Sequence, residues 1–380
     1  MQLRHKKADP SAVPIEFPVL NAARAIAALW VLVAHVTLIG AKPVFLLSQG
    51  YLAVECFIFI SGFLMMLVLW RERSLNLSSA FLFYTRRFFR IAPSFYFAIA
   101  LYVIFRGFYV ENLARCSDVF GSGSEIPGLG AEVGWRSILW NALFVHGLWP
   151  DEATKIFGPA WSLSLEMQFY LVAPIWAWFL KKRPFFAIGT YFAVNAIANV
   201  LWGVYFRQGL LATFWFPSFL PNRLFLFCWG GACCLFILEP TRRHRHLFAV
   251  ASVGAAILLP WKSLLICSIL VGAILFAVFS PKSFRRWGGR VAESRLVTWL
   301  AEFSYGVYLY HIFCMAIASW LLIRLGILSR QQPFALPIYF TAVIAVTLLV
   351  SAAIYFCAEK PARDWGKRLS RRGLDAPPMA

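Results

Sequence analysis

The sequence predicts an all-α protein that crosses a membrane about ten times, with both termini in the cytoplasm. First, 61% of its 380 residues are hydrophobic, including 16 Trp and 37 Phe, which is more apolar surface than a soluble domain of this size needs. Second, apolar stretches long enough to cross a bilayer recur along the chain. Third, the Lys and Arg that give a net charge of +19 lie in short segments between these stretches, which indicates membrane topology rather than nucleic-acid binding.

The first apolar stretch, residues 18–39, predicts a retained transmembrane helix. It is too long for a signal peptide, and no small-residue cleavage site follows it. Nine further spans are predicted at 50–70, 88–108, 161–180, 184–206, 222–239, 247–261, 264–280, 298–323 and 335–357. The pair around Pro260 requires a very tight turn. Residues 136–149 are apolar but short, which predicts a re-entrant or interfacial helix.

The distribution of basic residues sets the predicted orientation. With the N-terminus inside, 25 of the 36 Lys and Arg fall on the cytoplasmic side, as the positive-inside rule requires. We therefore expect a cytoplasmic arm at 1–17, a transmembrane domain at 18–357 and a cytoplasmic basic tail at 358–380. The loop 109–160 is then external, and its segment GSGSEIPGLG at 121–130 suits a flexible lid or rim. The eight Cys include no CxxC pair, so neither a disulfide framework nor a metal site is indicated.

The first span carries two ionisable residues, Arg24 and His35, which are 11 residues apart. Eleven steps of about 100° return to nearly the same helix face, roughly 16 Å further along. An ionisable side chain at this depth costs roughly 2.5–3.5 kcal/mol, so it usually faces a cavity or a partner. We expect both to face one interior space, Arg24 in the inner half of the membrane and His35 in the outer half. The alternatives are an Arg24 that extends to the interface and a His35 that only packs.

The second span contains Glu55 near its outer end. Its carboxylate is a candidate partner for His35 or for an acceptor hydroxyl, and the alternative is an interface carboxylate. The following Ser61 and Gly62 favour a close helix contact.

Three arginines, Arg86, Arg87 and Arg90, lie where the chain enters the third span from the inner side. Such a cluster often only fixes topology or contacts anionic lipid. The alternative is a phosphate clamp, because guanidinium groups match phosphate bidentately. That clamp would suit the diphosphate of a nucleotide-bearing cofactor on the cytoplasmic face.

Four later residues complete the candidate set. Ser162 and Glu166 are four residues apart and share a helix face at the outer end of the fourth span, although a helix cap and dipole compensation are alternatives. Arg223 begins the sixth span on the outer side. His311 lies well inside the ninth span, where a hydrogen-bonded core histidine is the alternative.

In their order along the chain, these residues resemble the acyltransferase-3 family of integral membrane O-acyltransferases. Arg24 and His35 have the family's R-x10-H spacing, and Glu55 lies in a GYxxVECFIFISGF segment. The segments RRFFRIAPSFY and WSLSLEMQFYL, an Arg ahead of Gly230, and SYGVYLYH ending at His311 follow. Glu-Lys-Pro at 359–361 stands where the family commonly has Glu-Arg-Pro. The resemblance spans residues 17 to 366, and its specificity comes from the order of the motifs.

The resemblance implies transfer of an acyl group, usually acetyl, from cytoplasmic acyl-CoA to a hydroxyl of a sugar or other acceptor on the far side. It implies the stand-alone form in a bacterial inner membrane, acting in O-acetylation of a polysaccharide or glycolipid with no metal and no nucleic acid. His35 is then the catalytic base, with Glu55 or Glu166 fixing its tautomer or holding the acceptor. The implied CoA-binding residues are Arg24, Arg86, Arg87 and Arg90, and the implied acceptor-binding residues are Ser162, Arg223 and His311.

The main alternative is a transporter, because intramembrane Arg, His and Glu also mark ion and substrate routes. Duplicated halves and paired broken helices, which transporters often show, are not evident in the sequence. A structural scaffold would leave several costly intramembrane charges unexplained. The residues leave open the identity of the acceptor and the choice between direct transfer and an acyl-His or acyl-Ser intermediate.

Overall fold

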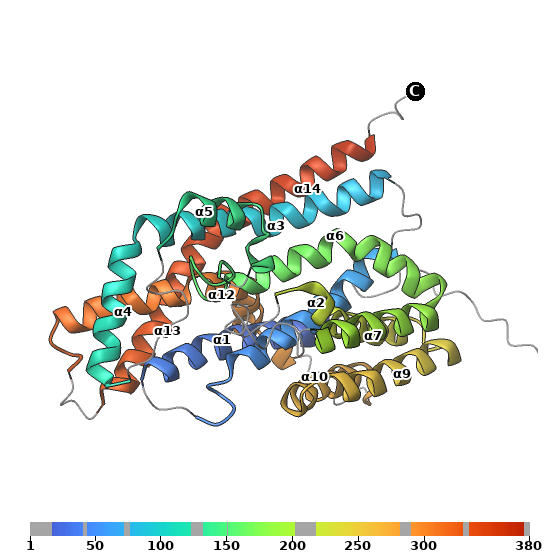
Figure 1. The fold of residues 1–380 in the computed structure, drawn as a ribbon, viewed down its shortest axis with the longest axis horizontal. Coiled ribbons are helices and arrows are strands. Elements are labelled where there is room, and N and C mark those ends of the chain that lie inside the picture. The colour runs from blue at the N-terminus through green and yellow to red at the C-terminus, as the bar shows by residue number, and fades with distance from the viewer. Residues whose placement is uncertain are drawn as a thin grey trace, which may run out of the picture.

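The computed structural model describes residues 17–40, 44–71, 77–122, 132–149, 151–201, 218–281, 290–329 and 334–375, and these residues form helices joined by turns. The long helices run side by side in a bundle (Figure 1). The α-helices are α1 (Pro18–Ile39), α2 (Gly50–Arg71), α3 (Leu77–Ile104), α4 (Arg106–Phe120), α5 (Trp135–Ala142), α6 (Ala160–Lys182), α7 (Pro184–Leu201), α8 (Leu224–Leu238), α9 (Arg242–Leu258), α10 (Trp261–Phe279), α12 (Arg295–Arg324), α13 (Ala335–Ile354) and α14 (Lys360–Asp375).

The predicted all-helical, multi-span fold is confirmed. A helix occupies each of the ten predicted spans, and eight helices among the described residues are long and apolar enough to cross a membrane. The other two spans form shorter helices, since α8 has 15 residues and α9 has 17. The tight turn also exists, because only Leu259 and Pro260 separate α9 from α10. The protein is a polytopic membrane protein.

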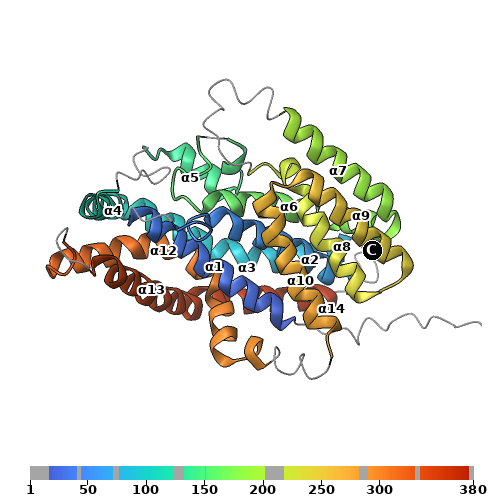
Figure 2. The ribbon, with the colours of Figure 1, turned by 90° about the horizontal axis from the view of Figure 1, so that it is seen from below.

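Helices α2 and α8 make the most extensive helix–helix contact among the described residues, and Figure 2 shows them adjacent to each other. A Cβ atom at Gly62 of α2 would lie 2.1 Å from the carbonyl oxygen of Phe227, and one at Gly230 of α8 would lie 2.1 Å from that of Phe59. Only glycine allows two helix backbones to approach so closely. This contact confirms the close helix packing expected at Gly62 and lets the short α8 be buried along most of its length.

Helix α12 is the other central element and packs extensively against both α1 and α13. Seventeen of its 30 residues are buried, among them Tyr308, Tyr310 and His311. Because α1 is adjacent to α12, residues of the first and ninth predicted spans become neighbours. This pairing joins segments that are far apart in the sequence; His35 and His311, for example, are separated by 276 positions.

Two helices were not predicted. Helix α4 follows α3 directly and buries Tyr109, Asn112, Leu113 and Cys116, an i, i+3, i+4, i+7 pattern that the polar residues between them conceal. It ends at Phe120 and is followed by Gly121, whose φ of 65° suits a residue without a side chain.

The second is α14, which lies in the segment where only a basic tail was predicted. Helix α13 leads through a π-helical turn, Tyr355–Glu359, into α14, and the helix is continuous over Ala335–Ser370. Pro361 lacks the N–H that an α-helix would use to bond the carbonyl four residues earlier, and the wider π-turn accommodates this loss.

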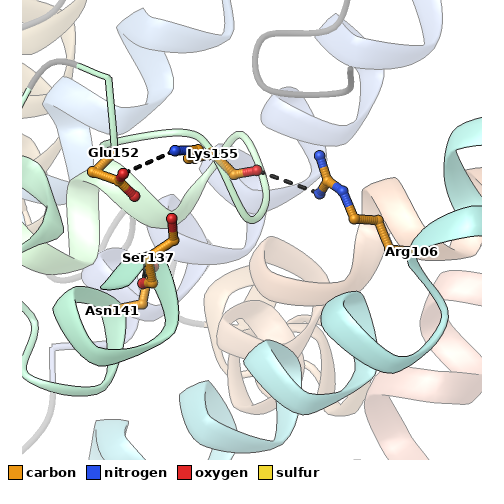
Figure 3. A network of polar contacts seen from close by, with 5 residues as sticks. All are labelled: Arg106, Ser137, Asn141, Glu152 and Lys155. Atoms are coloured by element: carbon orange, nitrogen blue, oxygen red, sulfur yellow. Dashed lines mark hydrogen bonds and ion pairs between the residues drawn. The ribbon is translucent and has the colours of Figure 1, made fainter. Parts of the chain in front are cut away.

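The segment between α4 and α6 contains α5 and a short 3₁₀ turn, His146–Leu148. This agrees with the short non-spanning helix expected at 136–149. Arg106 donates a hydrogen bond to the carbonyl oxygen of Lys155 at 3.5 Å, and Lys155 pairs with Glu152 at 2.9 Å, which ties this segment to α4 (Figure 3). Most of the proposed lid at 121–130 and almost all of the arm at 1–17 lie outside the described residues.

The orientation in the membrane can be tested directly. Helix α4, which Ser122 follows, and the C-terminal end of α14 lie at opposite ends of the molecule (Figure 1). We expect Ser122→Cys to be labelled from outside and Arg372→Cys from the cytoplasm by a membrane-impermeant thiol reagent. The background is Cys357→Ser, because the other seven native cysteines are buried. Labelling of position 122 only from the cytoplasmic side would contradict the predicted topology.

Candidate active site

A cavity of about 430 Å³ opens between α1, α2, α3, α6, α12 and α14. Its polar lining contains five basic side chains and three carboxylates. The basic residues are Arg24, Arg87, Arg90, Arg363 and Lys367, and the carboxylates are Glu166, Glu302 and Glu359. Basic residues therefore outnumber acidic ones, and the cavity favours an anionic ligand.

Glu166 lies on the cavity wall with two hydroxyl donors. Ser61 Oγ donates to Glu166 Oε1 at 3.1 Å, and the Tyr170 hydroxyl donates to the same oxygen. The guanidinium of Arg87 lies over the ring of Tyr170, 5.8 Å from its centroid. The carboxylate thus partly offsets the positive charge of the arginines while its Oε1 is held by the two hydroxyls.

His35 and His311 form a contacting pair beside the cavity. Nδ1 of His35 lies 2.9 Å from the carbonyl oxygen of Val31 and 3.2 Å from Nε2 of His311. Nδ1 of His311 lies 2.9 Å from the carbonyl oxygen of Tyr308. A carbonyl oxygen only accepts hydrogen bonds, so Nδ1 of each ring carries the proton.

The tautomers follow from these contacts. His311 Nε2 carries a lone pair. It can accept a hydrogen bond from the His35 Nδ1–H, which also donates to the Val31 carbonyl oxygen. In the neutral ring, His35 Nε2 therefore carries a lone pair, and no hydrogen bond from it is found among the described residues. His311 is fully buried, whereas His35 is half-buried. A half-buried imidazole with an unoccupied lone pair is suited to accept a proton from a hydroxyl.

Ser162 and Tyr308 connect the lining of the cavity with the histidine pair. Both line the cavity, and their oxygens are 2.6 Å apart. The Tyr308 hydroxyl also lies 3.0 Å from the carbonyl oxygen of Pro159. On the other side, the Tyr308 and His311 ring centroids are 6.4 Å apart. The lining next to His311 therefore includes two hydroxyls, together with the ring of Phe57, whose centroid is 5.9 Å from that of Tyr308.

The structure brings together seven of the ten residues singled out in the sequence. Five of them, Arg24, Arg87, Arg90, Ser162 and Glu166, line the cavity. The other two, His35 and His311, lie in contact beside it. Arg24 and His35 were expected to face one interior space. Arg24 lines the cavity, whereas His35 is not among its lining residues, so the two do not share it.

The other three residues lie elsewhere. Arg86 turns away from the cavity and donates from Nε to Ser370 Oγ of α14 at 3.0 Å. Glu55 and Arg223 form a buried ion pair of 2.7 Å, with side chains 1% and 10% exposed. Neither Glu55 nor Glu166 has a hydrogen bond to His35 among the described residues. Val31 and His311, not a carboxylate, thus fix the tautomer of His35.

Several cavity residues were not anticipated, namely Ser61, Tyr170, Glu302, Tyr305, Tyr308, Glu359, Arg363 and Lys367. Helical spacing could have found some of them. Thr298, Glu302, Tyr305 and Tyr308 lie three or four residues apart on one face of α12. Glu359, Arg363 and Lys367 follow the same rule, but only if the C-terminal segment is recognised as a helix.

A third buried histidine, His146, lies outside this site. It is fully buried in the 3₁₀ turn before α6, where its Nε2 is 2.9 Å from the carbonyl oxygen of Ala160. Burial lowers the pKa of His146 to about 4. The ring is therefore neutral at pH 7 and fixes this turn to the start of α6.

The chain matches a protein family described as an acyltransferase domain over residues 17–356. It is 26% identical over 378 residues to acyltransferase MdmB of Streptomyces mycarofaciens, covering 91% of this chain and 92% of that protein. It is 24% identical over 334 residues to peptidoglycan O-acetyltransferase OatA of Listeria monocytogenes, covering 77% of this chain and 48% of that protein. The match thus spans about half the length of OatA. No solved structure matches the chain.

The Glu55–Arg223 pair allows a stability test. We expect Arg223→Met to lower the melting temperature in detergent strongly, because loss of one partner of a buried ion pair typically costs about 3–5 kcal/mol. The double variant Glu55→Gln/Arg223→Met should be more stable than the single variant, because no charge is left uncompensated. Equal losses in the two variants would contradict a structural role for the pair. Loss of acyl transfer in a stable double variant would support the catalytic role first considered for Glu55.

Proposed function

Given that this chain belongs to the acyltransferase family, we propose that it moves an acetyl group from cytoplasmic acetyl-CoA to a hydroxyl of a glycan on the outer side of a bacterial plasma membrane. One observation supports this most: a cavity lined by arginines also contains the bonded hydroxyls of Ser162 and Tyr308, and Tyr308 lies next to a pair of contacting histidines. The cavity suits the charged part of the donor, and the histidine pair suits activation of the acceptor.

The donor is expected to bind with its phosphates on the arginines of the cavity. Arg24, Arg87 and Arg90 lie on α1 and α3, and guanidinium groups form charge-assisted, bidentate hydrogen bonds to phosphate oxygens. Arg86 is not part of this group, because it contacts Ser370 instead. The long, uncharged pantetheine arm then extends toward Ser162 and Tyr308.

His35 acts as the general base in this mechanism. Its Nε2 takes the proton of the acceptor hydroxyl as the hydroxyl oxygen attacks the thioester carbonyl carbon. The C–S bond breaks, and the CoA thiolate takes the proton back from His35. The products are the O-acyl ester and free CoA, and His35 returns to its starting tautomer. Direct transfer needs no further nucleophile.

His311 acts as a positioning residue. It is fully buried, so it does not contact the acceptor. Its Nε2 accepts from the His35 Nδ1–H, which keeps Nε2 of His35 unprotonated and the ring in one orientation. When His35 takes a proton, this same contact stabilises the charged ring.

The glycan acceptor is proposed from the relatives. The name of OatA gives peptidoglycan as its acceptor and an acetyl group as the group transferred. A hydroxyl of a cell-surface glycan is the same kind of acceptor, and the external side of the membrane is where such glycans lie. The same reasoning supports O-acetylation as the reaction here.

Replacement of His35 tests the function and the base together. In a strain that lacks this protein, mass spectrometry should show surface glycans without the O-acetyl ester, which wild-type protein restores. His35→Ala should fail to restore it, because loss of a general base costs about 10²–10⁴-fold in rate. The purified variant should still bind CoA, because His35 does not line the cavity. Normal glycan acetylation by the variant would refute the assignment.

Replacement of His311 tests the positioning role. His311→Gln keeps a hydrogen-bond acceptor, whereas His311→Leu has a similar size but no acceptor. We expect the Gln variant to retain more acetyl transfer than the Leu variant, with equal CoA affinity in both. A role in packing alone predicts the reverse order, because leucine suits a fully buried site better than a polar amide. Transfer and CoA affinity are measured for both variants in detergent.

A further inference from the structure

Helix α14 extends beyond the stretch matched by the family, yet it contributes side chains to the cavity. Glu359, at the end of the π-turn, lies four residues before Arg363, which lies four residues before Lys367. Residues four apart share one helix face, and all three line the cavity. Two of the five basic groups of the cavity therefore come from α14.

Helix α14 is fixed against α3. Trp365 makes an edge-on contact with Phe89, with centroids 4.7 Å apart, and a Cβ atom at Gly366 would lie 2.5 Å from Cβ of Phe89. Further along, Ser370 Oγ accepts a hydrogen bond from Arg86. Figure 1 shows the two helices side by side over much of the length of α14. The basic groups of α14 thus have fixed positions rather than belonging to a loose tail.

Two arginines of the cavity have buried donors without partners. Nε of Arg363 and Nε of Arg87 are both buried and have no hydrogen-bond partner among the described residues. Arg363 uses Nη2 to bond the Tyr355 hydroxyl at 2.9 Å. A buried donor without a partner is costly, and an anionic ligand in the cavity would satisfy both.

The cavity has two ends, which can be identified from the positions of its lining residues along α12 and α14. Tyr308 and Thr298 line it from positions ten residues apart on α12, which corresponds to about 15 Å. Tyr308 marks the end near the histidines. Lys367 marks the open end, because it lies beyond Arg363 on α14 and its side chain is 57% exposed. Its ammonium group also pairs with Asp364 at 3.3 Å.

We propose that α14 forms a phosphate-binding site at the open end of the donor cavity, where Arg363 and Lys367 bind the 3′-phosphate of CoA. This inference rests on the proposed function. The thioester must reach the Tyr308 end, so the nucleotide at the other end of CoA lies at the open end. Arg24, Arg87 and Arg90 remain for the diphosphate. Anionic lipid headgroups offer the same phosphate chemistry at this position, and the experiment separates the two sources.

The experiment compares the binding of CoA and 3′-dephospho-CoA to the purified full chain in detergent by calorimetry. Wild-type protein should bind CoA about tenfold more tightly or better, because hydrogen bonds between charged groups are strong. Lys367→Gln and Arg363→Gln should each weaken CoA binding while leaving 3′-dephospho-CoA binding unchanged, which also shows that the variants are folded. Arg368→Gln is the control, because Arg368 is exposed and does not line the cavity.

Each other outcome is decisive. Equal affinity of wild-type protein for the two ligands overturns the inference and leaves lipid headgroups as the phosphates that these side chains meet. The inference also fails if the two variants keep the preference for CoA, or if Arg368→Gln abolishes it. If wild-type protein binds neither ligand, the proposed function fails instead, which distinguishes the two failures.

Discussion

The cost of an ionisable side chain inside a bilayer organises this protein. Such groups are stable only where they face a cavity or a partner, and the fold provides one of these for each. Glu55 and Arg223 neutralise each other in a buried pair. Arg24 and Glu166 line a polar cavity with other charged groups. The two histidines have neutral tautomers and bond to backbone carbonyls and to one another. The site is thus where the fold concentrates charges that lipid excludes.

Close helix packing holds this arrangement in place. Gly62 and Gly230 let α2 and α8 approach until only glycine fits, and Ser61, next to Gly62, donates to Glu166. The packing that excludes side chains at Gly62 therefore also sets the position of a cavity donor. Interfaces of this kind tolerate little change in volume. The position of the Ser61 hydroxyl that donates to Glu166 therefore depends on Gly62 and Gly230, which do not themselves line the cavity.

Local sequence patterns predicted the helices and the inward-facing residues, because both depend on apolar length and helical spacing. They did not predict the contact between His35 and His311, which are 276 residues apart, because which helices pack together is not a local property. Arg86 and Arg87 are adjacent in sequence, but about 100° of helix rotation places only Arg87 in the cavity. Helix α14 was missed because its many charged residues suit a solvated tail equally well, and only its contact with α3 distinguishes the two.

Under the proposed function, the chemistry proceeds inside the membrane without carrying charge across it. The phosphates of the donor are costly to desolvate, and in this proposal the arginines hold them on the cytoplasmic side. A thioester is uncharged, so only a neutral group would have to pass Ser162 and Tyr308. His35 would then offer a neutral ring to an uncharged hydroxyl, with charge developing only as the proton moves. His311 and the Val31 carbonyl lie at the other ring nitrogen, where they would stabilise that transient charge.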